Sequence, residues 1–192
     1  PLELAEGVAE PDHVLEGTLA CVACGARYPI VRGLPRLLGE PAEGCSPTAE
    51  RFAEEWRRYH GLAPHYEQQF LDWLAPVGRD DFRGRKVFEG GCGKGRHTSL
   101  AASFGAVAVV AIDLGEAAEV AFANTRDLET VHVAIGDLRR PPVRPVFDLA
   151  FSIGVIHHLP EPGAGFRGLV QTLGPGGRVA MIDTERGSGE LY

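Results

Sequence analysis

The sequence predicts an α/β fold in which a doubly wound, mostly parallel sheet follows a small N-terminal β ribbon. From residue 86 onward, apolar runs of strand length alternate with helical stretches, which is typical of parallel strands joined by helical crossovers. Residues 1–38 differ in character, because they carry few helix signals, a C-x-x-C pair and a run punctuated by proline and glycine. With 44% hydrophobic and 23% charged residues, the composition is that of a globular chain and excludes intrinsic disorder.

Four parts follow one another along the chain. Residues 1–38 form the ribbon, 39–46 a linker by composition, 47–78 two helices, and 79–192 the sheet core. The chain opens at Pro1 rather than at a methionine, so we expect it to be a piece of a longer protein. No apolar stretch approaches the roughly 20 residues that a membrane-spanning helix needs, so no membrane partner is expected.

Both helices before the sheet carry an aromatic stripe. The first is expected to start at Ser46-Pro47 and the second to stop at Pro76. Their aromatic residues recur at helical spacing: Phe52, Trp56 and Tyr59 in the first helix, and Tyr66, Phe70 and Trp73 in the second. Packing against the core would explain both stripes.

The sheet core is expected to hold five strands and three crossover helices. We place the strands at residues 87–88, 107–112, 131–135, 149–153 and 178–182. The helices between them are expected at 96–104, 116–127 and 164–173. Residues 138–145 contain three prolines and are expected to form no long helix.

A glycine-rich loop joins the first core strand to its helix. Gly91, Gly93 and Gly95 let the backbone turn tightly and approach a ligand closely, although a tight turn without any ligand needs glycine too. The spacing is acidic-x-G-x-G-x-G, with Glu89 ahead of the first glycine, whereas a dinucleotide fingerprint would have glycine at position 96, which is Arg96. We expect the Glu89 carboxylate to repel phosphates and to attract a cationic ammonium or sulfonium group.

Two further acids end the next two predicted strands. Asp113 is placed to accept both hydroxyls of a ribose, although a loop-capping acid would look the same. Asp137 is placed to accept from an exocyclic amine such as that of adenine. Because the carboxyl ends of parallel strands meet at one edge, we expect Glu89, Asp113 and Asp137 to share the edge at which open α/β sheets bind ligands.

This ordered set resembles the class I S-adenosylmethionine-dependent methyltransferases, most closely the type 11 small-molecule group. The resemblance covers about residues 87–182 and rests on five motifs in order: 89–95 (EGGCGKG), Asp113, Asp137, 147–159 (FDLAFSIGVIHHL) and 173–177 (LGPGG). It implies a Rossmann-like sheet with five strands present of an expected seven, so the core is expected to be truncated at its C-terminus. Many members have Asp where this chain has Glu89.

The resemblance also implies where S-adenosylmethionine binds. The glycine loop is expected to wrap the methionine part, Asp113 to hold the ribose, and Asp137 with Leu138 to flank the adenine. The full set of expected cofactor-binding residues is Glu89, Gly90, Gly91, Cys92, Gly93, Gly95, Asp113, Leu114, Asp137, Leu138, Ser152 and Ile153. No metal-binding residue is expected among them.

Chemistry at the acceptor needs a base only if the acceptor is protonated at working pH. His157 and His158, just after the fourth core strand, are the candidate bases, although one of them could simply orient the following loop. Cys92 is interpreted as a small residue in a tight turn rather than a nucleophile. Trp56 and Tyr59 are further candidates, because helices before the first strand cover the cofactor site in this family and an aromatic face attracts a sulfonium.

The N-terminal part resembles the second half of a zinc-ribbon module found on bacterial methyltransferases and as a free methyltransferase activator. Cys21 and Cys24 supply two of the four ligands that structural zinc needs. In that family a first C-x-x-C pair lies just before a segment like residues 1–4, so zinc is expected only if such an upstream pair completes the site. Tyr28, Ile30, Leu34 and Leu37 are expected to hold the ribbon in its absence.

Taken together, the sequence predicts a cytoplasmic, bacterial methyltransferase that transfers the methyl group of S-adenosylmethionine to a small-molecule acceptor by in-line displacement. A net charge of −7 disfavours nucleic acid as a partner. The alternative is a non-catalytic or regulatory partner protein that recruits others through its ribbon. A nucleotide-dependent oxidoreductase is disfavoured by Glu89 and Arg96. The sequence does not indicate an oligomeric state.

Overall fold

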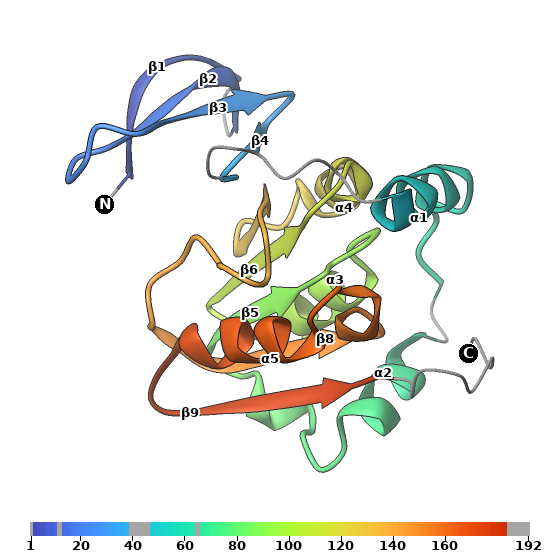
Figure 1. The fold of residues 1–192 in the computed structure, drawn as a ribbon. Coiled ribbons are helices and arrows are strands. Elements are labelled where there is room, and N and C mark those ends of the chain that lie inside the picture. Colours follow the sequence, from blue (N-terminus) through green and yellow to red (C-terminus); the bar gives the residue numbers. More distant parts are fainter. Residues whose placement is uncertain (1, 11–12, 39–46, 64–65, 184–192) are drawn as a thin grey trace.

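A computed structural model describes residues 2–10, 13–38, 47–63 and 66–183 of the chain (Figure 1). The N-terminal strands are β1 (Leu2–Glu10), β2 (His13–Cys21), β3 (Arg27–Val31) and β4 (Leu34–Pro35). The helices are α1 (Pro47–Arg58), α2 (Tyr66–Leu74), α3 (Arg96–Ser103), α4 (Ala117–Thr125) and α5 (Pro162–Gln171), with short 3-10 helices η1 (Arg79–Asp81) and η2 (Ile156–His158). The core strands are β5 (Lys86–Gly90), β6 (Ala108–Asp113), β7 (Val131–Ile135), β8 (Phe147–Ile153) and β9 (Leu173–Ile182).

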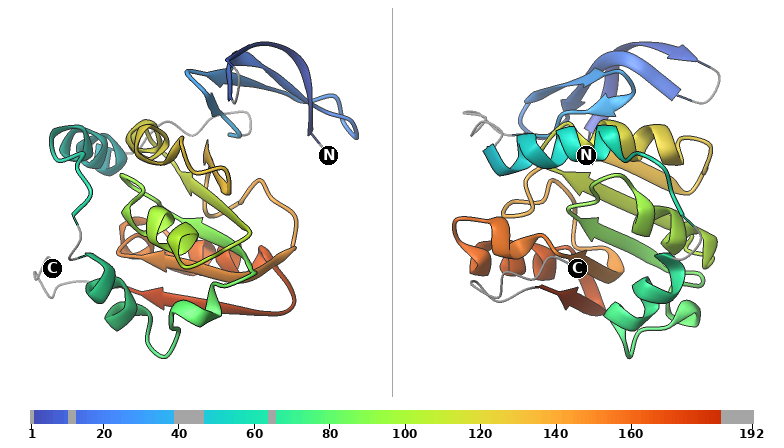
Figure 2. Two further views of the ribbon diagram at one scale, coloured as in Figure 1. Left: turned by 180° about the vertical axis from the view of Figure 1, so that it is seen from behind. Right: turned by 90° about the vertical axis from the view of Figure 1, so that its right-hand side faces the viewer.

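The core is a five-stranded sheet in the order β7-β6-β5-β8-β9, and every neighbouring pair is parallel. Helix α5 lies on one face of this sheet and α3 on the other, as the two views in Figure 2 show. The predicted doubly wound α/β fold is therefore confirmed. Because the strand order reverses between β5 and β8, the sheet has a switch point beside β5, where open α/β sheets bind ligands.

The predicted elements agree with the observed ones to within a few residues, apart from the last strand. This strand, β9, begins at Leu173 rather than at residue 178, because Leu173 already pairs with Phe147 before a register shift. Residues 138–145 form no helix, as expected from their prolines. The predicted linker 39–46, including Cys45 and Ser46, lies outside the described residues. No helix in the described ranges is long and apolar enough to cross a bilayer.

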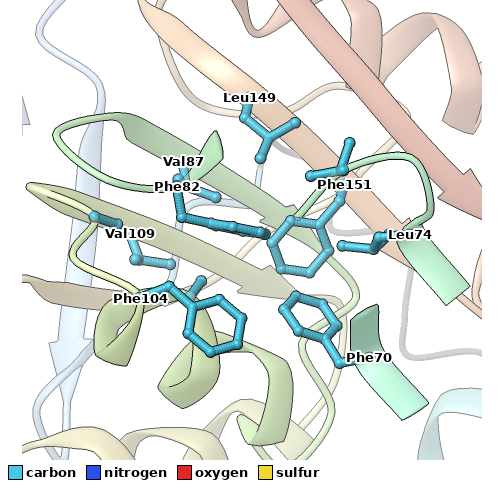
Figure 3. Packing of buried hydrophobic residues seen from close by; sticks show 11 residues of the cluster. Phe70, Leu74, Phe82, Val87, Phe104, Val109, Leu149 and Phe151 are labelled. Carbon is cyan, nitrogen blue, oxygen red and sulfur yellow. The ribbon is translucent and has the colours of Figure 1, made fainter. Parts of the chain in front are cut away.

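Of the aromatic stripe of α2, Phe70 packs into the main hydrophobic core, next to Leu74 of the same helix (Figure 3). Phe70 is fully buried, and its ring lies 5.7 Å from that of Phe82 and 5.4 Å from that of Phe151. These contacts join α2 to the strand β8 and to the segment that enters β5. Burial of a ring of this size is worth on the order of 2–3 kcal/mol, so α2 is anchored to the sheet.

The four N-terminal strands form a separate antiparallel sheet in the order β1-β2-β3-β4. Its attachment to the core runs through the segment after β3. Leu34 is fully buried in a cluster with residues of β6, α4 and β7, and the ring of Phe122 fills the space over Gly33. Beyond β4, Arg36 forms a parallel bridge with Ile135 of β7, and the N–H of Leu37 donates to the carbonyl of Ile135 at 2.8 Å. The segment that follows β4 therefore pairs with the end of β7, at the edge of the core sheet.

Candidate cofactor and active site

One pocket opens at the carboxyl ends of the core strands, between the glycine loop, α1 and the segment that joins β8 to α5. Its walls come from Phe52, Trp56, Gly91, Cys92, Gly93, Lys94, Arg96, His97, Ile112, Asp113, Leu114, Gly136, Asp137, Leu138, Ile153, Gly154, Val155, His158 and Leu159. The set includes most of the predicted cofactor-binding residues, although it leaves out Glu89, Gly90, Gly95 and Ser152. The fold therefore gathers the ends of four strands around a single cavity.

The glycine loop is shaped by positions that only glycine fills well. Gly91 has φ +81°, and a Cβ on it would overlap the side chain of Val155. Gly93 has φ +52°, and a Cβ there would lie 3.0 Å from Nε1 of Trp56. The N–H of Gly91 donates to the carbonyl of Ile112 at 2.8 Å, so the loop is fixed to the end of β6. Its backbone thus stands close to any group bound in the pocket.

Asp113 lines the pocket at the end of β6 and also fixes the loop. Its carboxylate accepts the backbone N–H of Gly93 at 2.9 Å and that of Gly115 at 3.2 Å. Burial raises the pKa of Asp113, while these backbone donors lower it. Each carboxylate oxygen keeps a lone pair beyond these bonds, which is the chemistry needed to accept from ribose hydroxyls.

Asp137 and Leu138 form the next part of the wall. The Asp137 carboxylate accepts the backbone N–H of Arg139 at 2.8 Å and pairs with the guanidinium of Arg139 at 2.8 Å. Leu138 is buried and packs over Gly90. Asp137 thus offers an oriented carboxylate that can accept from an exocyclic amine, and Leu138 offers an apolar surface beside it. A purine base could use both.

Glu89, at the end of β5, is buried and stands outside the pocket wall. It is only 2% exposed, does not line the pocket, and accepts a hydrogen bond from Oγ1 of Thr98 at 2.5 Å. Burial raises the pKa of Glu89 to about 8, so the side chain is largely neutral at pH 7. In the structure this side chain braces the first turn of α3, and its expected attraction for a cationic group stays a prediction. Ser152 has a similar supporting position, since its hydroxyl donates to the carbonyl of Gly90 at 2.9 Å.

The two candidate bases of η2 differ in their surroundings. His158 lines the pocket, with its ring centroid 5.0 Å from that of Phe52. His157 is turned to Asp183 at the end of β9, whose carboxylate accepts its backbone N–H at 2.8 Å and contacts its Nδ1. Burial lowers the pKa of both imidazoles, and the neighbouring His157 lowers that of His158 further. His158 is therefore neutral at pH 7 and able to accept a proton. Asp183 carried no sequence signal.

The aromatic residues of α1 also differ in whether they line the pocket. Phe52 and Trp56 line the pocket, and their rings stack with centroids 6.4 Å apart. Tyr59 is 59% exposed and lies outside the pocket wall, so of the two aromatic candidates only Trp56 faces the cavity. Cys92 is buried, and burial raises its thiol pKa well above the ordinary value, which agrees with its interpretation as a packing residue.

Lys94 is a pocket residue that the sequence interpretation passed over. Although it is only 4% exposed, its Nζ donates to the carbonyls of Tyr59 and Gly61, both at 2.9 Å. The ammonium also lies 5.3 Å from the ring centroid of Trp56 and 5.2 Å from that of Tyr66. These contacts tie the connection between α1 and α2 to the glycine loop.

The C-x-x-C pair forms a turn at the end of β2. The N–H of Gly25 donates to the carbonyl of Cys21, and the N–H of Cys21 to the carbonyl of Ala26, each at 2.8 Å. Hydrogen bonds from the backbone of Ala23 and Cys24 lower the pKa of the Cys21 thiol. In the described part of the chain, no cluster of three or more potential metal ligands includes this pair. Zinc binding thus still depends on further ligands.

Comparison with known proteins shows which proteins this chain is similar to. Residues 88–181 match the Methyltransf_11 family, described as a methyltransferase domain. A tRNA U34 carboxymethyltransferase of Idiomarina loihiensis is 29% identical over 136 residues, which cover 66% of this chain and 38% of that protein. A ubiquinone biosynthesis O-methyltransferase of Neisseria meningitidis is 30% identical over 150 residues, covering 71% of this chain and 60% of that protein.

The fold has solved counterparts as well. A Methanococcus maripaludis protein described as an S-adenosyl-L-methionine-dependent methyltransferase superposes with a TM-score of 0.58 at 18% identity, covering 76% of this chain and 67% of that one. Residues 88–181 thus match a methyltransferase domain, and the core has the fold of an S-adenosylmethionine-dependent methyltransferase. The chain spans 38% to 60% of the length of the two curated relatives.

Proposed function

We propose that this protein transfers the methyl group of S-adenosylmethionine to a small-molecule acceptor by in-line displacement. The observation that carries the proposal is the pocket itself, where the glycine loop, Asp113 and Leu138 meet on one side and Phe52 with His158 on the other. When bound, the cofactor supplies a methyl group on a sulfonium, which is already activated for transfer. The protein therefore has to bind the cofactor and the acceptor, orient them for transfer, and exclude water from the site.

The residues present fit this cofactor. Asp113 offers free lone pairs at the pocket wall, Leu138 an apolar surface beside Asp137, and the glycine loop a close backbone. The side of the pocket toward α1 is aromatic and apolar, and Trp56 offers the ring face that a sulfonium favours. These features match a ribose, a purine base and a cationic sulfur.

His158 is assigned as the base for acceptors that carry a proton at working pH. It lines the pocket next to Phe52, and its lowered pKa keeps the imidazole neutral. Asp183 acts through His157 as a positioning residue, because it fixes the ring against which His158 packs at a centroid distance of 3.8 Å. Protons would pass from the acceptor to His158 as the methyl group is transferred.

A small-molecule acceptor is favoured over RNA by charge. By their names, one of the relatives is a tRNA U34 carboxymethyltransferase and another an O-methyltransferase of ubiquinone biosynthesis. This chain has a net charge of −7, and phosphate binding draws most of its affinity from clustered Lys and Arg. The acceptor side of the pocket, formed by Phe52, Val155, His158 and Leu159, carries no permanently charged side chain.

Radiolabelled S-adenosylmethionine tests the proposal. The protein is incubated with the cofactor and either a protein-free metabolite extract or total tRNA, and transferred label is counted in each. We expect label in the metabolite fraction, lost in His158→Ala if the acceptor needs a base and kept in the exposed control His132→Ala. Label confined to tRNA would overturn the small-molecule acceptor. Absence of label from both, with a stoichiometric partner protein co-purifying, would favour the non-catalytic alternative.

A further inference from the structure

The segment that leaves α1 is bound through three successive backbone carbonyls, those of Tyr59, His60 and Gly61. Nζ of Lys94 donates to the first and the third, each at 2.9 Å. Nδ2 of Asn124 donates to the second at 2.8 Å and to the carbonyl of Lys94 itself at 2.9 Å. We call these four hydrogen bonds the clip. Because Lys94 belongs to the glycine loop and Asn124 to α4, two separate parts of the core hold one short stretch of backbone.

Lys94 brings to the clip a charge that is costly to bury. Its side chain is only 4% exposed, so the ammonium has given up most of its water. The charge-assisted hydrogen bonds to the two carbonyls offset this cost. The rings of Trp56 and Tyr66 offset it further, since their centroids lie 5.3 and 5.2 Å from Nζ. Most of these partners belong to α1 and the segment after it, so the ammonium stays satisfied only while α1 remains in place.

An exposed ion pair joins α1 to α4 as well. The two helices lie side by side (Figure 1), and Arg57 of α1 pairs with Glu116 just before α4. Both side chains are about half exposed, and ion pairs of this kind contribute little to stability. The buried clip therefore provides the stronger polar attachment of α1 to the core.

The position of α1 determines one wall of the pocket. Trp56 lies against the glycine loop, because a Cβ on Gly93 would be 3.0 Å from its Nε1. Phe52, about two turns of helix before the clip, contacts the ring of His158 at a centroid distance of 5.0 Å. How far Phe52 covers His158, and how closely Trp56 approaches a bound ligand, thus depend on where α1 is held.

We propose that Lys94 and Asn124 are positioning residues that hold α1 against the core and thereby keep Phe52 and Trp56 in the pocket wall. The inference rests on the proposed function, since it concerns the wall of the same pocket. Neither side chain has to touch the methyl group or the acceptor, because both act through α1. A bound ligand leaves when α1 shifts, so the clip slows its release.

Hydrogen exchange of the ligand-free protein tests the clip itself. Lys94→Met and Asn124→Leu keep side chains of similar size and remove the donors. We expect either variant to exchange the amides of α1 on the order of tenfold faster, as for the loss of one or two hydrogen bonds, while exchange in β5 and β8 stays unchanged. Arg57→Gln is the matched control on the same helix, because it breaks only the exposed ion pair and should exchange like the wild type.

The release of S-adenosylhomocysteine tests the effect of the clip on the pocket. Since the chain has two tryptophans, a Trp73→Phe background leaves Trp56 as the fluorescent reporter for stopped-flow measurements. We expect Lys94→Met and Asn124→Leu to raise the dissociation rate constant on the order of tenfold. Lys86→Met, which changes the other lysine of the chain, is exposed and should leave it unchanged. Misfolded protein would lower the amplitude of the signal but not change this rate constant.

Three results would overturn the proposal. The first is exchange in α1 equal to that of the wild type in both variants. The second is faster exchange throughout the sheet core, because that indicates a general loss of stability. The third is an unchanged dissociation rate constant in variants whose α1 exchanges faster, because the clip would then not govern the pocket. If the wild type binds no S-adenosylhomocysteine, the proposed function fails and the effect on release fails with it, whereas exchange still decides whether the clip holds α1.

Discussion

Replacing Asp113 by alanine isolates the residue on which the cofactor assignment depends most. The substitution removes the acceptor that we assign to the ribose and the hydrogen bonds to the N–H groups of Gly93 and Gly115. Hydrogen bonds to a charged group contribute about 1.5–3 kcal/mol. We therefore expect S-adenosylhomocysteine to bind about 10- to 150-fold more weakly.

Calorimetric titration at constant pH and salt measures this change, and thermal melting without ligand shows how far the loop contacts alone affect stability. Asp127→Ala is the matched control, because Asp127 is exposed and lies outside the pocket wall. Asp113→Asn should fall between the wild type and Asp113→Ala, since the amide keeps one acceptor oxygen. An affinity of folded Asp113→Ala within about twofold of the wild type would refute the assignment of Asp113 to the ribose.

Three further predictions concern stability. The pKa of Glu89 is raised to about 8 from an ordinary value of 4.5, so between these pH values the folded state holds a proton that the unfolded state releases. The pKa of His97 is lowered to about 3, and its opposite effect on the free energy of unfolding is confined to pH values below 6.5. The free energy of unfolding should therefore fall from pH 6.5 to 8, by up to about 1.4 kcal/mol per pH unit, and denaturant titrations of Glu89→Gln should show little of this slope. Gly91→Ala should lose about 1–3 kcal/mol because of its positive φ and the overlap with Val155, and a midpoint in urea equal to that of the wild type would contradict this. Leu34→Ala should cost about 2–5 kcal/mol, with faster hydrogen exchange in β7, whereas unchanged exchange there would mean that the ribbon does not support the core.

The fold could be predicted from the sequence because its signals are local. Apolar runs mark β5 to β9. Strand β5 ends in a glycine and β6 in an acid, and Gly136 and Asp137 directly follow β7. The last strand was predicted to start at residue 178, five residues after the observed start of β9, and this difference also has a local cause. Residues 174–177 are glycine and proline, which indicate a turn, yet Leu173 pairs with Phe147 because the parallel neighbour imposes extended backbone.

The side-chain contacts of the site were harder to predict. Strand β5 is buried on both faces after its first residue, so no alternation of polar and apolar positions shows on which side Glu89 lies. Lys94 is held mainly by backbone carbonyls, which leave no mark in a sequence. Asp183 meets His157 across 26 positions of chain. These contacts depend on tertiary placement, which residue spacing alone does not determine.

The contact between the ribbon and β7 connects the N-terminal antiparallel sheet to the core sheet. An edge strand exposes unpaired N–H and carbonyl groups that invite pairing with another chain, and the bridge between Arg36 and Ile135 occupies part of that edge. Ile135 is followed directly by Gly136 and Asp137 of the pocket wall. The segment that anchors the ribbon and two residues of the pocket wall therefore meet at the end of one strand, β7.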